Sequence, residues 1–257
     1  VNEGLLLIQI SYIQIDNFGP FTEEMGHNRE HKIQILLSEI FIFLQKKFNH
    51  YGGLVFSAAK DNMIAVTNGI SIKYHQSIIN EVEQNFPITI SIGIGVHQNP
   101  LDAQNEASKV LNLQGSAQSS RKNILAYNGH NFPIKSLVKV AHIDINFYTE
   151  IATNINPFYS NFINLNKGYL TLMQEFLKLG VMCFFNGGDN FISICPISMN
   201  LSELELILKS FEEKHKPWKL KAGIGVGENI LKAISKANIC LKKIRDGNNK
   251  QKILVMN

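Results

Sequence analysis

Six aspartates occur in this chain of 257 residues, and four of them fall in two repeated settings. Asp16 and Asp144 each end an apolar run, in IQIDNF and AHIDIN, and Asp61 and Asp189 each lie between two apolar runs, in AAKDNMIAV and FFNGGDNFIS. A carboxylate at the end of a buried strand is costly unless it is paired or coordinated. Two carboxylates that converge repel each other, so this pattern predicts paired aspartates that hold a divalent cation.

The glycines before Asp189 offer a simpler explanation for one of these sites. Gly187 and Gly188 supply the positive φ angles of a tight hairpin, which is consistent with a purely structural turn. Turn formation does not explain why an aspartate also ends the preceding strand-like segment in both halves. Carboxylates without cysteine or histidine partners suit Mg²⁺ or Mn²⁺, and Mg²⁺ completes its shell with water and phosphate oxygens. The sequence therefore predicts a catalytic site with two Mg²⁺ ions, with Asp16 and Asp61 as its first candidates and Asn17 as a further metal ligand. Asp144 and Asp189 belong either to the same composite site or to a degenerate second one.

The segment IDNFGPFT links the first aspartate to the first long helical pattern. A Gly-Pro bend with free backbone N–H groups near a helix start suits a triphosphate, although such a bend is often only a turn. The residues assigned to the triphosphate are Phe18, Gly19, Pro20, Phe21 and Thr22, and the two phenylalanines are either stacking partners for a base or core residues. Because this loop lies in the first half, we expect Asp16→Asn to reduce activity more than Asp144→Asn.

Further ligand contacts are predicted from residues next to the aspartates. The second half lacks the Gly-Pro pair but has glycines in its hairpin, which permit close approach of a ligand. The predicted contacts are Asn62 in the first half and Asn146, Gly187, Gly188 and Asn190 in the second. His142 is a candidate acid or base, with a hydrogen-bonded strand histidine as the favoured alternative.

The two halves are an internal duplication. Asp16 matches Asp144 and Asp61 matches Asp189 at a constant offset of 128 residues, and IGIGV matches AGIGV at an offset of 130 residues. We therefore expect two domains, residues 1–128 and 129–257, with the polar segment 114–135 as the connection.

Each half shows the same order of elements. In the first half, hydrophobic periodicity predicts strands at residues 6–15, 54–57, 62–66 and 88–96 and helices at about 33–48, 72–85 and 101–113. In the second half it predicts a strand at 138–143, a hairpin at 181–195, a strand at 220–226 and helices at 164–178, 201–213 and 229–244. The fold class is therefore α+β, with two tandem ferredoxin-like domains, each with a four-stranded antiparallel sheet and helices on one face.

Composition narrows the functional classes. The hydrophobic fraction is 45% and the charged fraction 18%, and the formal net charge is +4. No membrane span, signal peptide or dense basic run is recognisable, so we expect a cytoplasmic protein with no membrane or nucleic-acid partner. KLKAGIG and CLKKIRDG are interpreted as solvated faces, and the three cysteines as core residues in a reducing compartment.

Several motifs together resemble a known family. FNGGDNF is similar to the hairpin of GGDEF-type cyclases, and IQIDNFGPFT with DNMIAV is similar to the metal motifs of nucleotidyl cyclases and polymerase palm domains. The ordered set IQIDNFGPFT, DNMIAVTNGI, GSAQ, AHIDIN, GGDNF and KAGIGVG resembles archaeal-type GTP cyclohydrolase III over nearly the whole chain.

This resemblance implies a substrate, cofactors and an assembly. GTP would be opened at C8 with the formyl group retained and two phosphates released, with Mg²⁺ and with K⁺ or another monovalent cation. A homo-oligomer, either a dimer or a tetramer, is also implied. Two alternatives remain open: a nucleotidyl cyclase of the diguanylate or adenylate type, and a non-catalytic module that senses GTP.

Overall fold

The computed structural model describes residues 6–118, 121–247 and 251–257. The chain divides into two compact units, Val1–Leu137 with Asn229–Leu231, and Val138–Glu228 with Lys232–Asn257. The division proposed from the sequence, between residues 128 and 129, differs from this one by nine residues. In the part of the chain that the structure describes, no helix has the length and hydropathy needed to span a membrane.

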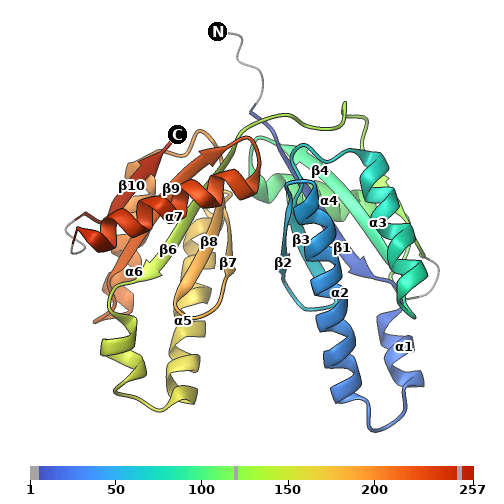
Figure 1. Ribbon diagram of the computed structural model, residues 1–257, viewed down its shortest axis with the longest axis horizontal. Coiled ribbons are helices and arrows are strands. Elements are labelled where there is room, and N and C mark those ends of the chain that lie inside the picture. The colour runs from blue at the N-terminus through green and yellow to red at the C-terminus, as the bar shows by residue number, and fades with distance from the viewer. Residues whose placement is uncertain (1–5, 119–120, 248–250) are drawn as a thin grey trace. The chain divides into compact units, whose positions relative to one another are not determined.

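The first unit contains one mixed sheet of order β2-β3-β1-β4-β5 (Figure 1). β1 lies at the centre and pairs antiparallel with β3 and β4, whereas β5 pairs parallel with β4. The strands are β1 (Ile8–Ile15), β2 (Leu54–Ser57), β3 (Asn62–Val66), β4 (Ile90–His97) and β5 (Leu125–Tyr127). The helices are α1 (Phe18–Glu24), α2 (Glu30–His50), α3 (Ile72–Asn85) and α4 (Pro100–Asn112).

The second unit repeats this plan with the order β10-β9-β6-β8-β7. Its strands are β6 (Val138–Ile145), β7 (Met182–Phe185), β8 (Asn190–Cys195), β9 (Leu220–Gly227) and β10 (Ile253–Met256). Its helices are the π-helix η1 (Thr149–Thr153), α5 (Phe158–Leu177), α6 (Leu201–Lys214) and α7 (Ile230–Asp246). Two tandem ferredoxin-like units in the α+β class were predicted, and the matching strand orders confirm that fold class.

Two details of the predicted sheets are wrong. Each sheet has five strands rather than four, because β5 and β10 add a parallel edge strand next to β4 and β9. β5 has only three residues and lies inside the segment that was interpreted as a connection, so its local pattern is too short to identify a strand.

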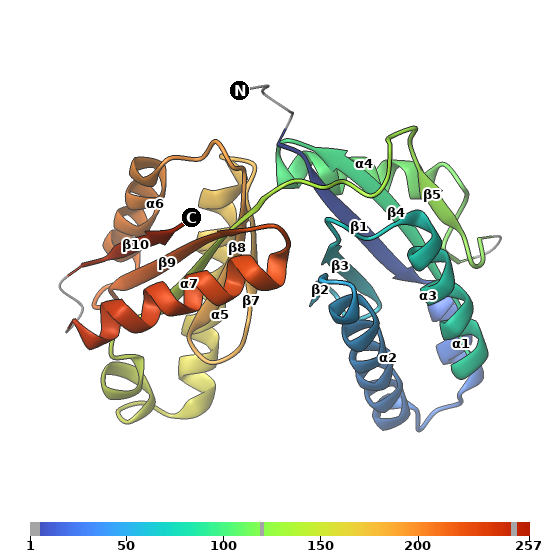
Figure 2. The same ribbon diagram turned by 45° about the horizontal axis from the view of Figure 1, so that its top comes forward.

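The helices also cover both faces of each sheet. In the first unit, α2 and α3 lie on one face and α4 on the other, and in the second unit α5 and α6 lie opposite α7 (Figures 1 and 2). The repeated G-x-G of β4 and β9 makes this second layer possible. A Cβ on Gly95 would lie 2.0 Å from the carbonyl oxygen of Ala103, and one on Gly225 would lie 2.0 Å from that of Ala233. α4 and α7 therefore pack directly on strand backbone, where only glycine fits.

The main core of each unit lies between the sheet and its helix pair. In the first unit, Ile13, Ile15 and Ile92 of the sheet pack against Ile40 and Leu44 of α2. In the second unit, Ile143 and Phe191 pack against Leu172 of α5 and Phe211 of α6. Residues of a strand alternate between the two faces of its sheet. Asp16 and Asp144 each directly follow one of these core residues, so they belong to the face opposite the main core.

Candidate functional site

The carboxylate pair of the second unit lies where β6 ends and the β7–β8 hairpin turns. In the register of β6, Asp144 lies opposite Asn190 of β8 on one side and Lys221 of β9 on the other. Gly187 and Gly188 have φ angles of 94° and 61°, so the hairpin is a tight glycine turn, and Asp189 follows it directly. The hairpin glycines therefore form a structural turn and also place the Asp189 carboxylate beside Asp144.

Asp189 lies close enough to Asp144 for its pKa to respond to the charge of that residue. Burial, and next the negative charge of Asp144, raise the pKa of Asp189 from 3.8 to about 6. Lys221 Nζ lies 3.0 Å from Asp144 Oδ1, and Arg245 forms an ion pair with Asp144 Oδ2. The Lys221 side chain is buried whereas that of Arg245 is half exposed. Two cations thus offset the repulsion within the carboxylate pair.

This donor set fits a magnesium ion. Two carboxylates are what Mg²⁺ commonly takes from a protein when phosphate and water supply its other ligands. Within residues 6–118, 121–247 and 251–257, no group of three or more His, Cys, Asp or Glu converges, so a site closed by protein ligands alone is not formed there. Asn146 Oδ1, two residues beyond Asp144, is buried without a hydrogen-bond partner and is a further oxygen donor near the end of β6.

The corresponding pair of the first unit is arranged differently. Asp16 accepts hydrogen bonds from Ser91 Oγ at 2.7 Å, from Thr89 Oγ1 at 3.0 Å and from the backbone N–H of Asn123 at 3.0 Å. Arg121 Nε lies 3.7 Å from Asp16 Oδ1, and both side chains are buried. All the acceptor positions that a metal would use on Asp16 are therefore engaged by the protein.

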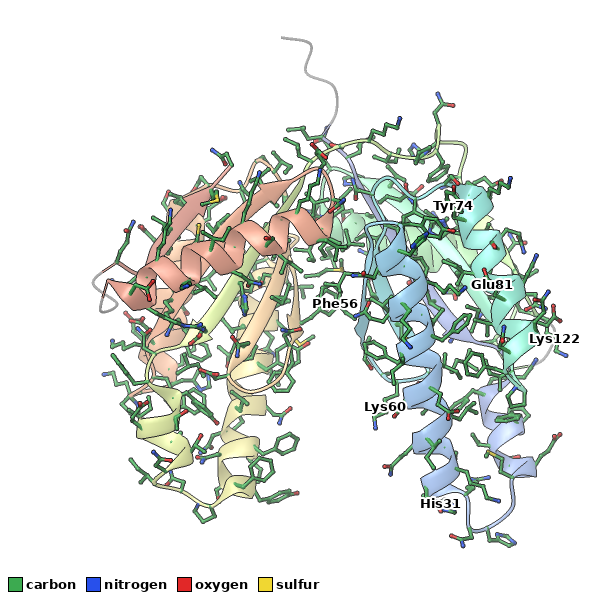
Figure 3. The ribbon with its side chains drawn as sticks, in the orientation of Figure 1. His31, Phe56, Lys60, Tyr74, Glu81 and Lys122 are labelled. Atoms are coloured by element: carbon green, nitrogen blue, oxygen red, sulfur yellow. The ribbon has the colours of Figure 1, made fainter. Side chains whose placement is uncertain are left out.

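Asp61 of the first unit lies at the tip of the β2–β3 hairpin, next to Lys60, which Figure 3 shows projecting from that tip. Its backbone carbonyl accepts a hydrogen bond from Ile15 N at 3.0 Å, so Asp61 lies opposite the residue that precedes Asp16. The pKa of Tyr12 is raised by burial and, to a smaller extent, by Asp61. Tyr12 Oη also donates to Asn62 Oδ1 at 2.6 Å, which engages the predicted ligand contact Asn62.

The predicted Gly-Pro bend is wrong, because Phe18–Glu24 form the short helix α1. Pro20 is tolerated in the first turn, where its missing N–H would have no helical partner. Asn17 has a φ of 52° and donates its N–H to Ala117 O at 2.6 Å, and Phe21 N donates to Asn17 O at 2.9 Å. Thr22 Oγ1 donates to the carbonyl oxygen of Gly19 at 2.8 Å. Several of the groups assigned to a triphosphate are thus already hydrogen-bonded.

The two phenylalanines of α1, Phe18 and Phe21, pack against the core of the first unit, which agrees with the alternative role given to them. Phe21 also lines a cavity of about 490 Å³ together with Asp16, Asn17 and Pro20. Lys122 lines the same cavity and lies near the C-terminal end of α3, as Figure 3 shows. Glu24 and Glu83 give this cavity an acidic wall.

The second unit has a cavity of about 280 Å³ that, unlike the cavity of the first unit, has no acidic wall. It is lined by side-chain amides, cations and rings from Asn156, Asn161, Asn164, Lys167, Lys214, His215, Lys216 and Trp218, and no carboxylate lines it. Tyr148 connects this cavity to the carboxylate pair. Its ring centroid lies 5.7 Å from that of Trp218, and its pKa is raised by burial and then by Asp189.

His142 is held by two asparagines. Its Nδ1 lies 2.5 Å from Asn238 Oδ1 and its Nε2 lies 3.0 Å from Asn190 Oδ1. Asn190 Nδ2 in turn donates to Asp189 Oδ1 at 3.3 Å. The hydrogen-bonded strand histidine was the favoured alternative, and through Asn190 it helps to orient the hairpin carboxylate.

Sequence reasoning missed the cations of both sites. Lys221 is only 4% exposed, so the interpretation of KLKAGIG as a solvated face is wrong for this lysine. Its position inside an apolar strand was the available signal, because a buried lysine requires an anionic partner. Arg245 lies in the last turn of α7 and Arg121 follows α4, and nothing local in the sequence marks them.

Comparison with known proteins gives a consistent result. A family model described as GTP cyclohydrolase III matches residues 10–257. The chain is 40% identical over 242 residues to GTP cyclohydrolase III of Methanothermobacter thermautotrophicus, an alignment that covers 94% of this chain and 96% of that protein. It is also 40% identical over 245 residues to GTP cyclohydrolase III of Methanobrevibacter smithii, covering 95% and 96%.

Similarity to solved structures is weaker. The active GGEEF domain of a diguanylate cyclase from Vibrio cholerae aligns with 49% of this chain and 85% of that chain, with 16% identity and a TM-score of 0.37. The α+β class follows instead from the two sheets and their strand order.

Proposed function

The chain belongs to the GTP cyclohydrolase III family, and we propose that it opens the imidazole ring of GTP at the carboxylate pair of its second unit. The reaction adds water at C8, retains the formyl group and releases two phosphates. The product is 2-amino-5-formylamino-6-(5-phosphoribosylamino)pyrimidin-4(3H)-one. The observation that supports this location is the convergence of Asp144 and Asp189, where burial and then the charge of Asp144 raise the pKa of Asp189 to about 6.

In this proposal Asp144 and Asp189 hold Mg²⁺, with Asn146 Oδ1 as a further oxygen donor. Two bound Mg²⁺ ions would neutralise the charge of the phosphates and lower the pKa of a bound water molecule. A monovalent cation such as K⁺ is proposed from the family resemblance alone.

The cations of the site have separate roles. Lys221 of β9 is buried and lies 3.0 Å from Asp144 Oδ1, so it holds the Asp144 carboxylate in place. Arg245 is half exposed and ends α7, so its guanidinium is free to turn from Asp144 towards the phosphates of GTP when a metal binds. Asn190, which bonds His142 and Asp189, holds the hairpin carboxylate in position.

The guanine base is placed in the cavity of the second unit. The cavity is separated from Asp189 by the ring of Tyr148, which suits a ligand whose phosphates lie at the carboxylates. Side-chain amides of Asn156 and Asn164 offer both donors and acceptors to a base edge, and Trp218 offers an apolar ring. Lysines at the rim favour an anionic ligand.

The first unit is proposed to keep the same motif in a structural form. Asp16 is paired with Arg121 rather than with a metal, and Asn17, Pro20 and Phe21 line a cavity with it. Phe18, Gly19, Thr22, Asp61 and Asn62 are proposed to have structural roles in the same unit. A cytoplasmic location is proposed because the three cysteines are buried and free, as expected in a reducing compartment. The resemblance also leads us to propose a homo-oligomer.

Mass analysis of GTP after incubation with the protein and Mg²⁺ tests the reaction. The expected product has lost two phosphates and retained the carbon of C8 as a formyl group. Recovery of intact GTP would support a non-catalytic sensing module, and loss of pyrophosphate without ring opening would support a cyclase. Because cyclase chemistry requires the 3′-hydroxyl, 3′-deoxy-GTP should still be opened if the proposal is right.

A further inference from the structure

One side-chain amide in the cavity of the second unit is buried and held in a single orientation. Asn161 of α5 lines this cavity and is only 5% exposed. Its Nδ2 donates to the carbonyl oxygens of Ala152 at 2.9 Å and of Asn156 at 3.3 Å. Because carbonyl oxygens only accept, both N–H groups of the amide are used and its oxygen faces away from them. Within the part of the chain that the structure describes, nothing donates to Asn161 Oδ1, which is therefore a fixed acceptor in the cavity wall.

His215, which directly follows α6, supplies a second acceptor to the same cavity. Its Nε2 lies 2.7 Å from Thr171 Oγ1, and the Thr171 hydroxyl also donates to the carbonyl oxygen of Lys167 at 3.0 Å. A hydroxyl has one proton, so both contacts are hydrogen bonds only when His215 Nε2 is the donor. Burial, and next the charge of Lys214, lower the pKa of His215, which favours the neutral ring. In a neutral ring with its proton on Nε2, Nδ1 accepts.

The ring of His215 belongs to an aromatic stack. Its centroid lies 4.6 Å from that of Phe211 and 6.2 Å from that of Trp218, with interplanar angles of 27° and 18°. Gly168 of α5 allows this stack to form against the helix, since a Cβ there would lie 3.2 Å from atoms of both Phe211 and Trp218. The stack fixes the plane of the imidazole, and Trp218 presents a flat apolar surface to a planar ligand.

The size of the cavity and its cations also restrict the ligand. Its volume of about 280 Å³ is just below the range of about 300–1,000 Å³ that is typical of ligand pockets, which suits a single base with its phosphates outside. Lys167, Lys214 and Lys216 line the cavity and can only donate. The cavity thus combines two acceptors with several donors around a flat surface.

Guanine is the base whose edge matches this set of groups. It has two neighbouring donors, N1–H and the 2-amino group, next to the acceptor O6. Hypoxanthine lacks the amino group, and adenine has a bare nitrogen at N1, which would face an acceptor. The amides of Asn156 and Asn164 are exposed and can turn to suit either a donor or an acceptor. Discrimination between bases therefore depends on the groups that are held in place.

We propose that Asn161 Oδ1 and His215 Nδ1 select guanine in this cavity by accepting hydrogen bonds from N1–H and the 2-amino group of the base. The assignment rests on the proposed function, which places the base of GTP in the same cavity. It adds the two residues that distinguish GTP from ITP and ATP.

The fluorescence of Trp218 tests the selection directly, because Trp218 is the only tryptophan of the chain and lines the cavity. Titration of the full chain in EDTA with GMP, IMP and AMP requires neither a metal ion nor turnover. From GMP to IMP the dissociation constant should rise by about 10-fold, through the loss of one hydrogen bond. From GMP to AMP it should rise by about 100-fold or more. Equal affinities for the three nucleotides, or no fluorescence change with GMP, overturns the proposal.

Substitutions of the two acceptors test their roles. Asn161→Leu removes one acceptor and should reduce the preference for GMP over AMP by about 10-fold. His215→Phe keeps an aromatic ring in the stack and removes the other acceptor, so it should reduce the same preference even if Asn161→Leu fails to fold. Asn166→Leu is the matched control, because Asn166 is an exposed residue of α5 that does not line the cavity. Circular dichroism checks folding, and a wild-type preference in the folded acceptor variants contradicts the proposal.

Turnover of GTP with Mg²⁺ separates this proposal from the proposed function. If GTP is not opened and GMP is still preferred over AMP, the proposed reaction is wrong and the selection of guanine stands. If GTP is opened and the three monophosphates bind equally, the reaction stands and the selection by Asn161 and His215 is wrong.

Discussion

Arg121 and Asp16 form an ion pair whose side chains are 1% and 0% exposed, with Arg121 Nε 3.7 Å from Asp16 Oδ1. The equivalent aspartate, Asp144, pairs instead with Lys221 and with an arginine that is half exposed. One duplicated carboxylate is therefore sealed within its unit, whereas the other lies beside a second carboxylate and a cation that is free to move. In our proposal this difference separates the roles of the two halves.

We predict that Asp144→Asn reduces kcat for GTP by about 100-fold or more with little change in thermal stability. Lys221 retains a negative neighbour in Asp189, and Arg245 turns to solvent. Asp16→Asn should instead lower the free energy of unfolding of the first unit by about 3–5 kcal/mol, because it leaves the buried Arg121 unpaired. Steady-state kinetics and thermal denaturation of both variants, compared side by side, check this. The reverse result, with activity lost only in a stable Asp16→Asn variant, would return the site to the first unit as the sequence suggested.

We predict that Asp189→Asn stabilises the protein without divalent cations and removes the stabilisation that Mg²⁺ provides. The raised pKa of Asp189 means that the folded state holds its proton more tightly than the unfolded state between about pH 4 and pH 6. Its contribution to stability is therefore lost as the pH rises through about 6, when both carboxylates become charged. Thermal melts at pH 7.5 with EDTA and with Mg²⁺ measure both effects. Asn190→Asp adds a third carboxylate, so we expect it to lower the melting temperature in EDTA.

We predict an acid-sensitive step in the first unit at His75. Burial lowers the pKa of His75 from 6.5 to about 4, and its two nitrogens contact Ser11 Oγ and the carbonyl oxygen of Ser71, both at 2.9 Å. A histidine with a lowered folded-state pKa contributes stability above pH 6.5, and that contribution is lost as the pH falls towards 4. The loss is about 3 kcal/mol. Urea denaturation from pH 7 to pH 4 should show this slope in the wild type and not in His75→Gln.

We predict that Gly95→Ala and Gly225→Ala each destabilise their own unit by about 2–3 kcal/mol. In each case the added methyl group would overlap a backbone carbonyl of the helix packed on the strand, which no side-chain rotation relieves. Gly129→Ala is the control, since a Cβ there meets nothing within 4 Å. Equal melting temperatures for all three variants would show that α4 and α7 do not pack on these strands as described.

The sequence by itself determined the repeated elements. β2, β3 and α3 begin and end at the predicted residues, because alternation, helical periodicity and Gly or Pro boundaries act over a few neighbouring positions. The same local signals marked the four aspartates and the hairpin glycines. They did not identify β5, whose three residues are too short to show a period, or β10.

Only the tertiary structure decided what each carboxylate meets. Asp144 and Lys221 are 77 residues apart in the chain and adjacent in the sheet, and Asp16 and Arg121 are 105 residues apart and in contact. These partners come from strand pairing and from where the chain returns after the last helix of each unit. Electrostatic energy depends on distance in space and on burial, neither of which a local pattern contains. For this reason two nearly identical motifs formed a buried ion pair with Arg121 in the first unit and a carboxylate pair beside Lys221 and Arg245 in the second.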